Sequence, residues 1–99
     1  MVLTLQNYQE NIAESHGLAM LAFTAKWCSS CKAMYPIMER ADWLRIYLVD
    51  AEEEEKLVQQ FGVQSLPTFI LFRDGCIISE LRGKVKSELF LAWARGDNP

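Results

Sequence analysis

The stretch TAKWCSSCKAMYPI, residues 24–37, places two cysteines where an apolar run changes to a helical pattern. A helix that begins at Cys28 would put Cys28 and Cys31 one turn apart on the same face. Their Cα atoms would then lie within the ~4.4–6.8 Å that a disulfide requires. Unpaired N–H groups and the dipole at the helix start favour a thiolate at Cys28 more than at Cys31. The spacing therefore predicts an asymmetric dithiol, in which Cys28 attacks and Cys31 resolves the mixed disulfide.

Two other roles for the pair remain open. A structural disulfide would close a loop of about four residues, which stabilises a domain with its own core only weakly. A zinc site would need four ligands, and the chain offers Cys28, Cys31, Cys76 and His16. Neither His16 nor Cys76 belongs to a paired ligand motif, so each is expected to be a surface or strand residue. The sequence therefore favours redox chemistry and no metal.

Composition limits the remaining possibilities. The 99 residues, 51% of them hydrophobic, are enough for a single domain with one core, over residues 1–99. The net charge of −3, without a basic stripe, argues against nucleic acid or an anionic membrane surface as a partner. The apolar run at residues 17–25 is too short to span a bilayer, and no basic segment precedes it. Three cysteines are not a secreted disulfide framework, so we expect a cytoplasmic protein.

Hydrophobic periodicity predicts strands that alternate with helices. The strands are expected at residues 1–5, 18–23, 45–49, 68–72 and 76–81, and the helices at residues 7–16, 32–41, 50–61 and 85–93. Asp50 and Glu53 have the spacing of a capping box, which predicts a helix start at Asp50. Asp74-Gly75 predicts a tight hairpin between the last two strands. Val85, Leu89, Phe90 and Trp93 predict the apolar face of the terminal helix.

This order of elements defines the fold class. Parallel strands joined by crossover helices, followed by an antiparallel hairpin, give an α/β fold with a central mixed sheet. Helices are then expected on both faces of that sheet.

Two segments together, FTAKWCSSCK (residues 23–32) and QSLPTFILF (residues 64–72), resemble the thioredoxin family. The resemblance covers nearly the whole chain. It includes Trp27 before the first cysteine, Lys32 after the second, and Pro36 in the helix that follows. Pro67 matches the family's cis-proline, although a trans proline that opens a strand remains an alternative.

The resemblance implies a thioredoxin fold and a thiol–disulfide oxidoreductase that is its own redox carrier, without a cofactor. It implies that Trp27, Leu66, Pro67 and Gly83 shape the groove that binds disulfide-containing protein substrates. A thioredoxin-reductase-like donor would supply electrons to a monomer, with net reduction expected in the cytosol. A glutaredoxin-like activity is disfavoured because no glutathione site is recognisable. The alternative from another class is a protein-binding module whose dithiol is incidental or regulatory.

Two departures from the family pattern concern the site itself. Ser29-Ser30 stands where prototypical thioredoxins have Gly-Pro, and Ala22 stands where they bury an acidic residue. Nor does the RIYLV segment, residues 45–49, hold a lysine partner for such an acid. We therefore expect a less reducing pair, and a Cys31 that loses its proton without help from a buried carboxylate.

Overall fold

The computed structural model describes residue 12 and residues 16–96. The strand predicted at residues 1–5 lies outside them. So does the helix predicted at residues 7–16, apart from Ile12 and its final residue. Ile12 is fully buried against the sheet core.

Within the described residues, four strands form one mixed sheet in the order β2-β1-β3-β4. Their bounds are Leu18–Thr24 for β1, Arg45–Asp50 for β2, Thr68–Arg73 for β3 and Cys76–Arg82 for β4. Strand β1 runs parallel to β2 and antiparallel to β3, and β3 runs antiparallel to β4. The predicted mixed sheet is therefore confirmed.

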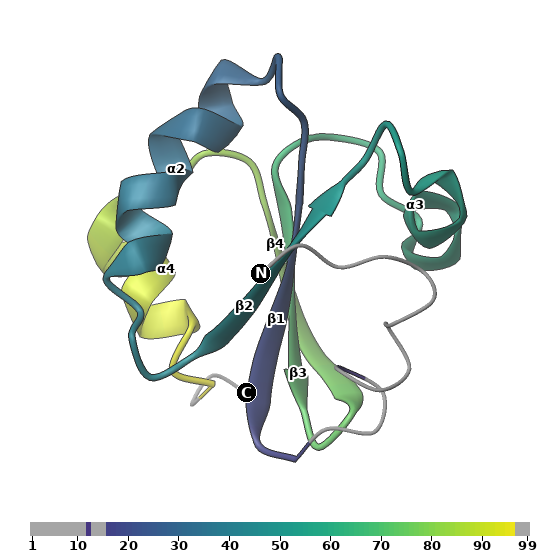
Figure 1. The fold of residues 1–99 in the computed structure, drawn as a ribbon. Coiled ribbons are helices and arrows are strands. Elements are labelled where there is room, and N and C mark those ends of the chain that lie inside the picture. Colours follow the sequence, from purple (N-terminus) through teal and green to yellow (C-terminus); the bar gives the residue numbers. More distant parts are fainter. Residues whose placement is uncertain (1–11, 13–15, 97–99) are drawn as a thin grey trace.

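In the described part of the chain, three helices pack on the sheet, and their bounds are Ser29–Glu39 for α2, Glu55–Phe61 for α3 and Ser87–Trp93 for α4. Figure 1 shows α2 and α4 on one face of the sheet and α3 on the other. The two-faced covering expected from the sequence is thus observed. In the part of the chain that the structure describes, no helix is long and apolar enough to cross a membrane.

The central strands β1 and β3 are apolar on both sides because each face is covered by helices. Met20 and Ala22 of β1 pack with Met34 of α2 and Phe90 of α4. The alternate residues of β1 face the opposite core, together with Leu57 of α3. This alternation explains why residues 18–23 read as one unbroken apolar run.

The hairpin between β3 and β4 follows the prediction. Asp74 and Gly75 have φ angles of 51° and 82°, and two positive φ angles are what a two-residue hairpin turn of type I′ requires. The Asp74 carboxylate also accepts a hydrogen bond from the N–H of Gly17 at 2.7 Å, so the turn is tied to the start of β1.

The predicted start of the third helix is wrong. Asp50 does not cap it: its carboxylate accepts the N–H of Glu52 at 2.9 Å, and its C=O accepts the N–H groups of Glu53 and Glu54. These bonds form a turn, and α3 begins only at Glu55. Its end near Phe61 is confirmed, with Gly62 in the left-handed conformation.

The terminal helix is shorter than predicted and its apolar face differs in one residue. Phe90 and Trp93 are buried, and the Trp93 indole donates a hydrogen bond to the Ser79 hydroxyl at 2.8 Å. Leu89, however, is 57% exposed, so its assignment to the core face is wrong. The helix begins at Ser87, and Val85 packs against the core from the segment before it.

Candidate functional site

Cys28 lies at the N-cap of α2, directly after the loop that follows β1. Its sulfur accepts a hydrogen bond from the backbone N–H of Cys31 at 3.2 Å. Its own N–H donates to the C=O of Ala25 at 3.1 Å, which holds the cysteine against the end of the strand. The residue is 6% exposed. An N-cap sulfur that accepts a free helix N–H is in the position predicted for a stabilised thiolate.

Cys31 lies one turn further along α2 and has no exposed surface. Burial, then the hydrogen bond with Cys28 and the charge of Cys28, raise the pKa of the Cys31 thiol to about 11, while a backbone hydrogen bond from Ala25 acts in the opposite direction. Both cysteines are free thiols in the structure. The pair is therefore a reduced dithiol with one sulfur near the surface and one enclosed.

Strand β1 supplies no carboxylate that could accept the proton of the Cys31 thiol. Ala22, at the position where the family buries an acid, is fully buried among apolar side chains, including Met34 and Phe69. Ile46, Tyr47 and Leu48 occupy the middle of the neighbouring strand β2. The proton of the Cys31 thiol must therefore pass to water or to a substrate thiolate rather than to a buried acid on this strand.

The loop before β3 faces the dithiol. The Leu66–Pro67 peptide bond is cis, so the trans alternative is excluded. Leu66 packs against Ala25, Cys28 and Cys31. The backbone N–H and C=O of Leu66 have no hydrogen-bond partner within residues 16–96. This backbone is therefore available to an extended segment of another chain.

Gly83 is held beside this loop. Its N–H donates to the C=O of Pro67 at 2.8 Å, and its φ is +82°, a conformation that glycine adopts without strain. A Cβ added at Gly83 would meet no atom within 4 Å. The open space above Gly83 therefore adjoins the Pro67 turn.

A groove of about 440 Å³ opens beside Cys28. Three of the predicted site residues line it, Trp27, Cys28 and Leu66, and the Trp27 side chain is 67% exposed. Sequence reasoning missed the other lining residues, which are Ala51, Val58, Val63, Gln64 and Ser65. These residues belong to α3 and its flanking loops and have no motif of their own, so only the fold brings them to Cys28.

A larger hollow of about 520 Å³ lies elsewhere, between the end of α2 and the strand β2, and contains neither cysteine. Its lining includes Met38, Leu44 and Ile46. The dithiol groove, although smaller, is the one that holds a chemically reactive group.

The zinc alternative has no ligand set in the described part of the chain, where no three His, Cys, Asp or Glu residues are grouped to hold a metal ion. Cys76 pairs with Arg73, which in turn pairs with Leu18 at the start of β1. Cys28 follows the other end of this seven-residue strand. Since a strand rises about 3.3 Å per residue, roughly 20 Å separates Cys76 from the dithiol.

Comparisons with known proteins agree with this geometry. The thioredoxin family model matches residues 1–95. The chain is 35% identical to a thioredoxin of Chlamydia muridarum, over 75% of this chain and 74% of that protein. It is 33% identical to a thioredoxin of Alicyclobacillus acidocaldarius, over 84% and 83% of the two chains.

Solved structures show the same fold. A mutant thioredoxin from Halobacterium salinarum superposes with a TM-score of 0.87 at 21% identity, over 96% of this chain and 87% of that one. The family model, the relatives, the fold and the placement of the dithiol lead to one conclusion: this chain belongs to the thioredoxin family and is a thiol–disulfide oxidoreductase.

Proposed function

We propose that Cys28 is the nucleophile and Cys31 the resolving thiol of a reaction that reduces disulfides in other proteins. The observation that carries this assignment is the hydrogen bond from the Cys31 N–H to the Cys28 sulfur at the start of α2. That N–H is a free helix donor and stabilises negative charge on Cys28. Cys31, enclosed and with a raised pKa, stays protonated until a mixed disulfide has formed.

The reaction has two exchange steps. The Cys28 thiolate attacks one sulfur of the substrate disulfide, and the other substrate sulfur leaves as a thiolate that takes up a proton. Cys31 then loses its proton and attacks the Cys28 sulfur of the mixed disulfide. The Cys28–Cys31 disulfide forms and the second substrate thiol is released. Two electrons pass from the protein to the substrate; of the two protons that the substrate thiols take up, one balances the proton lost by Cys31 and the other comes from solvent.

Four further residues shape the substrate groove in this proposal. Trp27 offers an exposed aromatic surface beside Cys28. The free backbone of Leu66 pairs with an extended substrate segment, and Pro67 turns the chain without adding a competing N–H. Gly83 leaves room for the substrate beside this turn.

The wider setting follows from the same proposal. Residues 1–99 act as a single domain, in monomeric form and in the cytoplasm, within electron transport that maintains cell redox balance. No cofactor is needed because the dithiol carries the electrons. A thioredoxin-reductase-like protein reduces the Cys28–Cys31 disulfide after each cycle.

Trapping of substrates tests the roles of the two cysteines. Cys31→Ser should accumulate mixed disulfides through Cys28 that dithiothreitol releases, because the second step is blocked. Cys28→Ser should form none. A binding module, by contrast, would keep the same partners in the Cys28→Ser/Cys31→Ser double variant, and that result would overturn the proposal.

A further inference from the structure

The groove at Cys28 is apolar on the side formed by α3. Val58 of α3 and Val63 of the following loop line it together with Trp27 and Leu66. A residue next to the cysteine of a substrate must lie within a few ångströms of the Cys28 sulfur, and therefore against this surface. Removal of apolar area from water stabilises such a contact by about 25 cal/mol per Å². The groove thus favours an apolar side chain beside the substrate cysteine.

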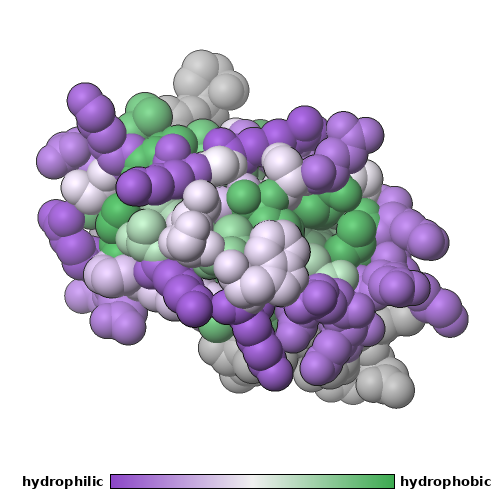
Figure 2. All heavy atoms as spheres, turned by 90° about the horizontal axis from the view of Figure 1, so that it is seen from above, coloured by the Kyte–Doolittle hydropathy of each residue, from purple (hydrophilic) through white to green (hydrophobic). Residues whose placement is uncertain are grey.

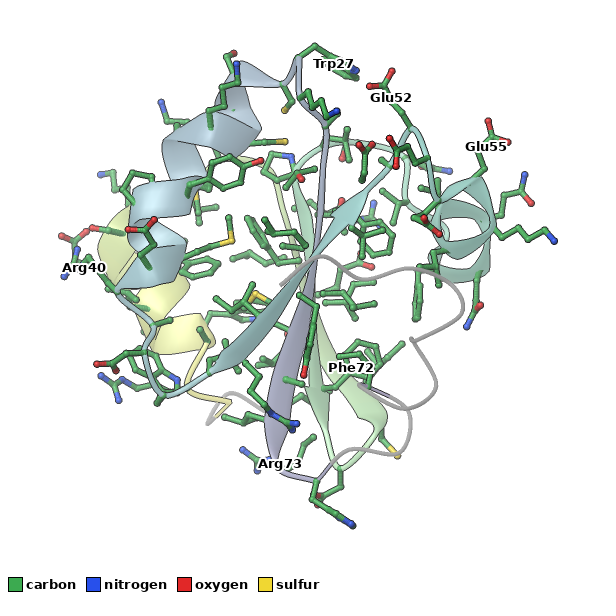
Figure 3. The ribbon with its side chains drawn as sticks, in the orientation of Figure 1. Trp27, Arg40, Glu52, Glu55, Phe72 and Arg73 are labelled. Carbon is green, nitrogen blue, oxygen red and sulfur yellow. The ribbon has the colours of Figure 1, made fainter. Side chains whose placement is uncertain are left out.

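An acidic rim, defined here as Asp50 and Glu52–Glu55, borders the groove at Ala51. The side chains of Glu52, Glu53 and Glu55 are exposed. Figure 3 places Trp27, Glu52 and Glu55 at the same end of the molecule. Figure 2, which looks onto this end from above, shows apolar side chains gathered in the middle and hydrophilic ones around them. The rim therefore faces a substrate that approaches the groove.

Basic side chains offset the rim only in part. Lys56 follows it in sequence, and Lys26 lines a separate hollow of about 300 Å³ together with Asp50 and Glu53. Arg40 and Arg73 lie far from Trp27 (Figure 3). Five acids and one base in residues 50–56 leave a local excess of negative charge larger than that of the whole chain. A cationic group on the partner would complement this excess.

We infer that the groove selects disulfides in extended segments that carry an apolar residue beside the cysteine and a lysine or arginine a few residues beyond it. This inference rests on the proposed function, because it assumes that Cys28 attacks the substrate. Its source is the juxtaposition of an apolar groove, a reactive sulfur and an acidic rim. The rim acts mainly on the rate of encounter, and salt weakens its action.

Peptide disulfides test the selection directly. Peptides with a central Val-Cys-Val, the cysteine disulfide-linked to 2-mercaptoethanol, would carry flanking lysines, glutamines or glutamates. The second-order rate constant of thiol release is measured with the reduced protein at low and high salt. We expect the lysine peptide to react about tenfold faster than the glutamate peptide at low salt. The ratio should approach one at about 1 M salt, where the Debye length is about 3 Å.

Charge-reversal variants assign the effect to the rim. Glu52→Lys/Glu55→Lys should abolish the preference for lysine over glutamate peptides, because residues 50–56 then carry equal numbers of acids and lysines. The matched control is Glu39→Lys/Asp42→Lys, which makes the same charge change beside the hollow at the far end of α2. This control should keep the wild-type preference. A lysine preference that both double variants alter equally would mean a net-charge effect and would overturn the inference.

The preference for an apolar residue beside the substrate cysteine has a separate test. Replacement of both valines of the lysine peptide by serine should slow its reaction several-fold at either salt concentration. Equal rates for the valine and serine peptides would contradict the role of Val58 and Val63 in the protein. Cys28→Ser separates the two levels of the proposal. If that variant still releases thiol at the wild-type rate, the proposed function itself fails. If release needs Cys28 but is equal for all peptides, only the inference about selection fails.

Discussion

The backbone N–H of Cys31 points to the sulfur of Cys28 across 3.2 Å, so in the proposed mechanism the resolving residue stabilises the nucleophile before it reacts. The same residue keeps its own thiol fully enclosed. A single turn of α2 therefore separates the two roles, and the differences between the cysteines can be measured.

The first prediction concerns the pH dependence of resolution. Burial is the largest cause of the raised Cys31 pKa of about 11, and unlike the effects of Cys28 it does not depend on a free Cys28 thiol. Below that pKa the Cys31 thiolate fraction grows about tenfold per pH unit. Stopped-flow resolution of a pre-formed mixed disulfide should therefore accelerate steadily from pH 6 to 9. A rate that stays flat over this range would show that another group takes the proton.

The second prediction concerns the reduction potential. Proline at position 30 would remove a backbone N–H from the first turn of α2, beside the Cys28 sulfur, and would remove the Ser30 hydroxyl. Loss of this N–H weakens the stabilisation of negative charge at the helix start in the reduced form, and about 1.4 kcal/mol corresponds to 30 mV. A redox-buffer titration should place the wild type above about −270 mV, the thioredoxin value.

The Ser29→Gly/Ser30→Pro variant should lie tens of millivolts lower than the wild type. Ser30→Ala separates the hydroxyl from the backbone N–H, since it removes only the former. In the described residues the Cys28 sulfur accepts from the Cys31 N–H and not from the Ser30 hydroxyl. An unchanged potential in the double variant would refute the role assigned to the serines.

The third prediction concerns Ala22. Ala22→Asp would bury a carboxyl among apolar side chains without a partner, which raises its pKa above the usual ~3.9. The native state then binds protons that the unfolded state has lost, so stability should fall as pH rises above 4. Urea unfolding should show a deficit of about 2–4 kcal/mol at pH 7 that shrinks toward pH 4. Ala22→Asn is the control, and its deficit should not change with pH.

The fourth prediction concerns Gly83. Its positive φ strains any L side chain, so Gly83→Ala should lower the free energy of unfolding by about 1 kcal/mol. Gly17→Ala is a matched control, because Gly17 has a φ of +78° and equally open surroundings. It directly precedes the first residue of β1. Both variants should lose similar stability.

Only Gly83→Ala should also slow the reduction of protein disulfides, because its methyl group enters the space beside Pro67. Its rate with a small disulfide should change little. Equal rates of protein reduction in the two glycine variants would remove Gly83 from the groove.

The spacing of the two cysteines and the four described strands could be predicted because each depends on local features, whereas the cis Leu66–Pro67 bond was expected from the resemblance to the thioredoxin family. Cys28 and Cys31 are three residues apart, and residues 18–23 form a continuous apolar run. The start of α3 could not be predicted in this way, since Asp50 can bond either to a helix end or to a tight turn. The outcome was a turn, in which Asp50 accepts the Glu52 N–H.

Two other features depend on tertiary structure alone. Val58 and Val63 line the groove because α3 packs over the strand next to the dithiol, and no spacing in the sequence indicates this. Leu89 fits the apolar period of α4, yet it remains exposed. Periodicity identifies the apolar face of a helix but not the width of the surface that covers it.

The enclosure of Cys31 one turn below Cys28 also bears on damage by peroxides. Peroxide would oxidise the more accessible Cys28 to a sulfenic acid, which is reversible. The Cys31 thiol can then condense with it, releasing water and forming the disulfide that the catalytic cycle already uses. Further oxidation to the sulfinic acid, which is not readily reversed, competes with this intramolecular step. A buried partner thiol thus protects Cys28 from permanent inactivation.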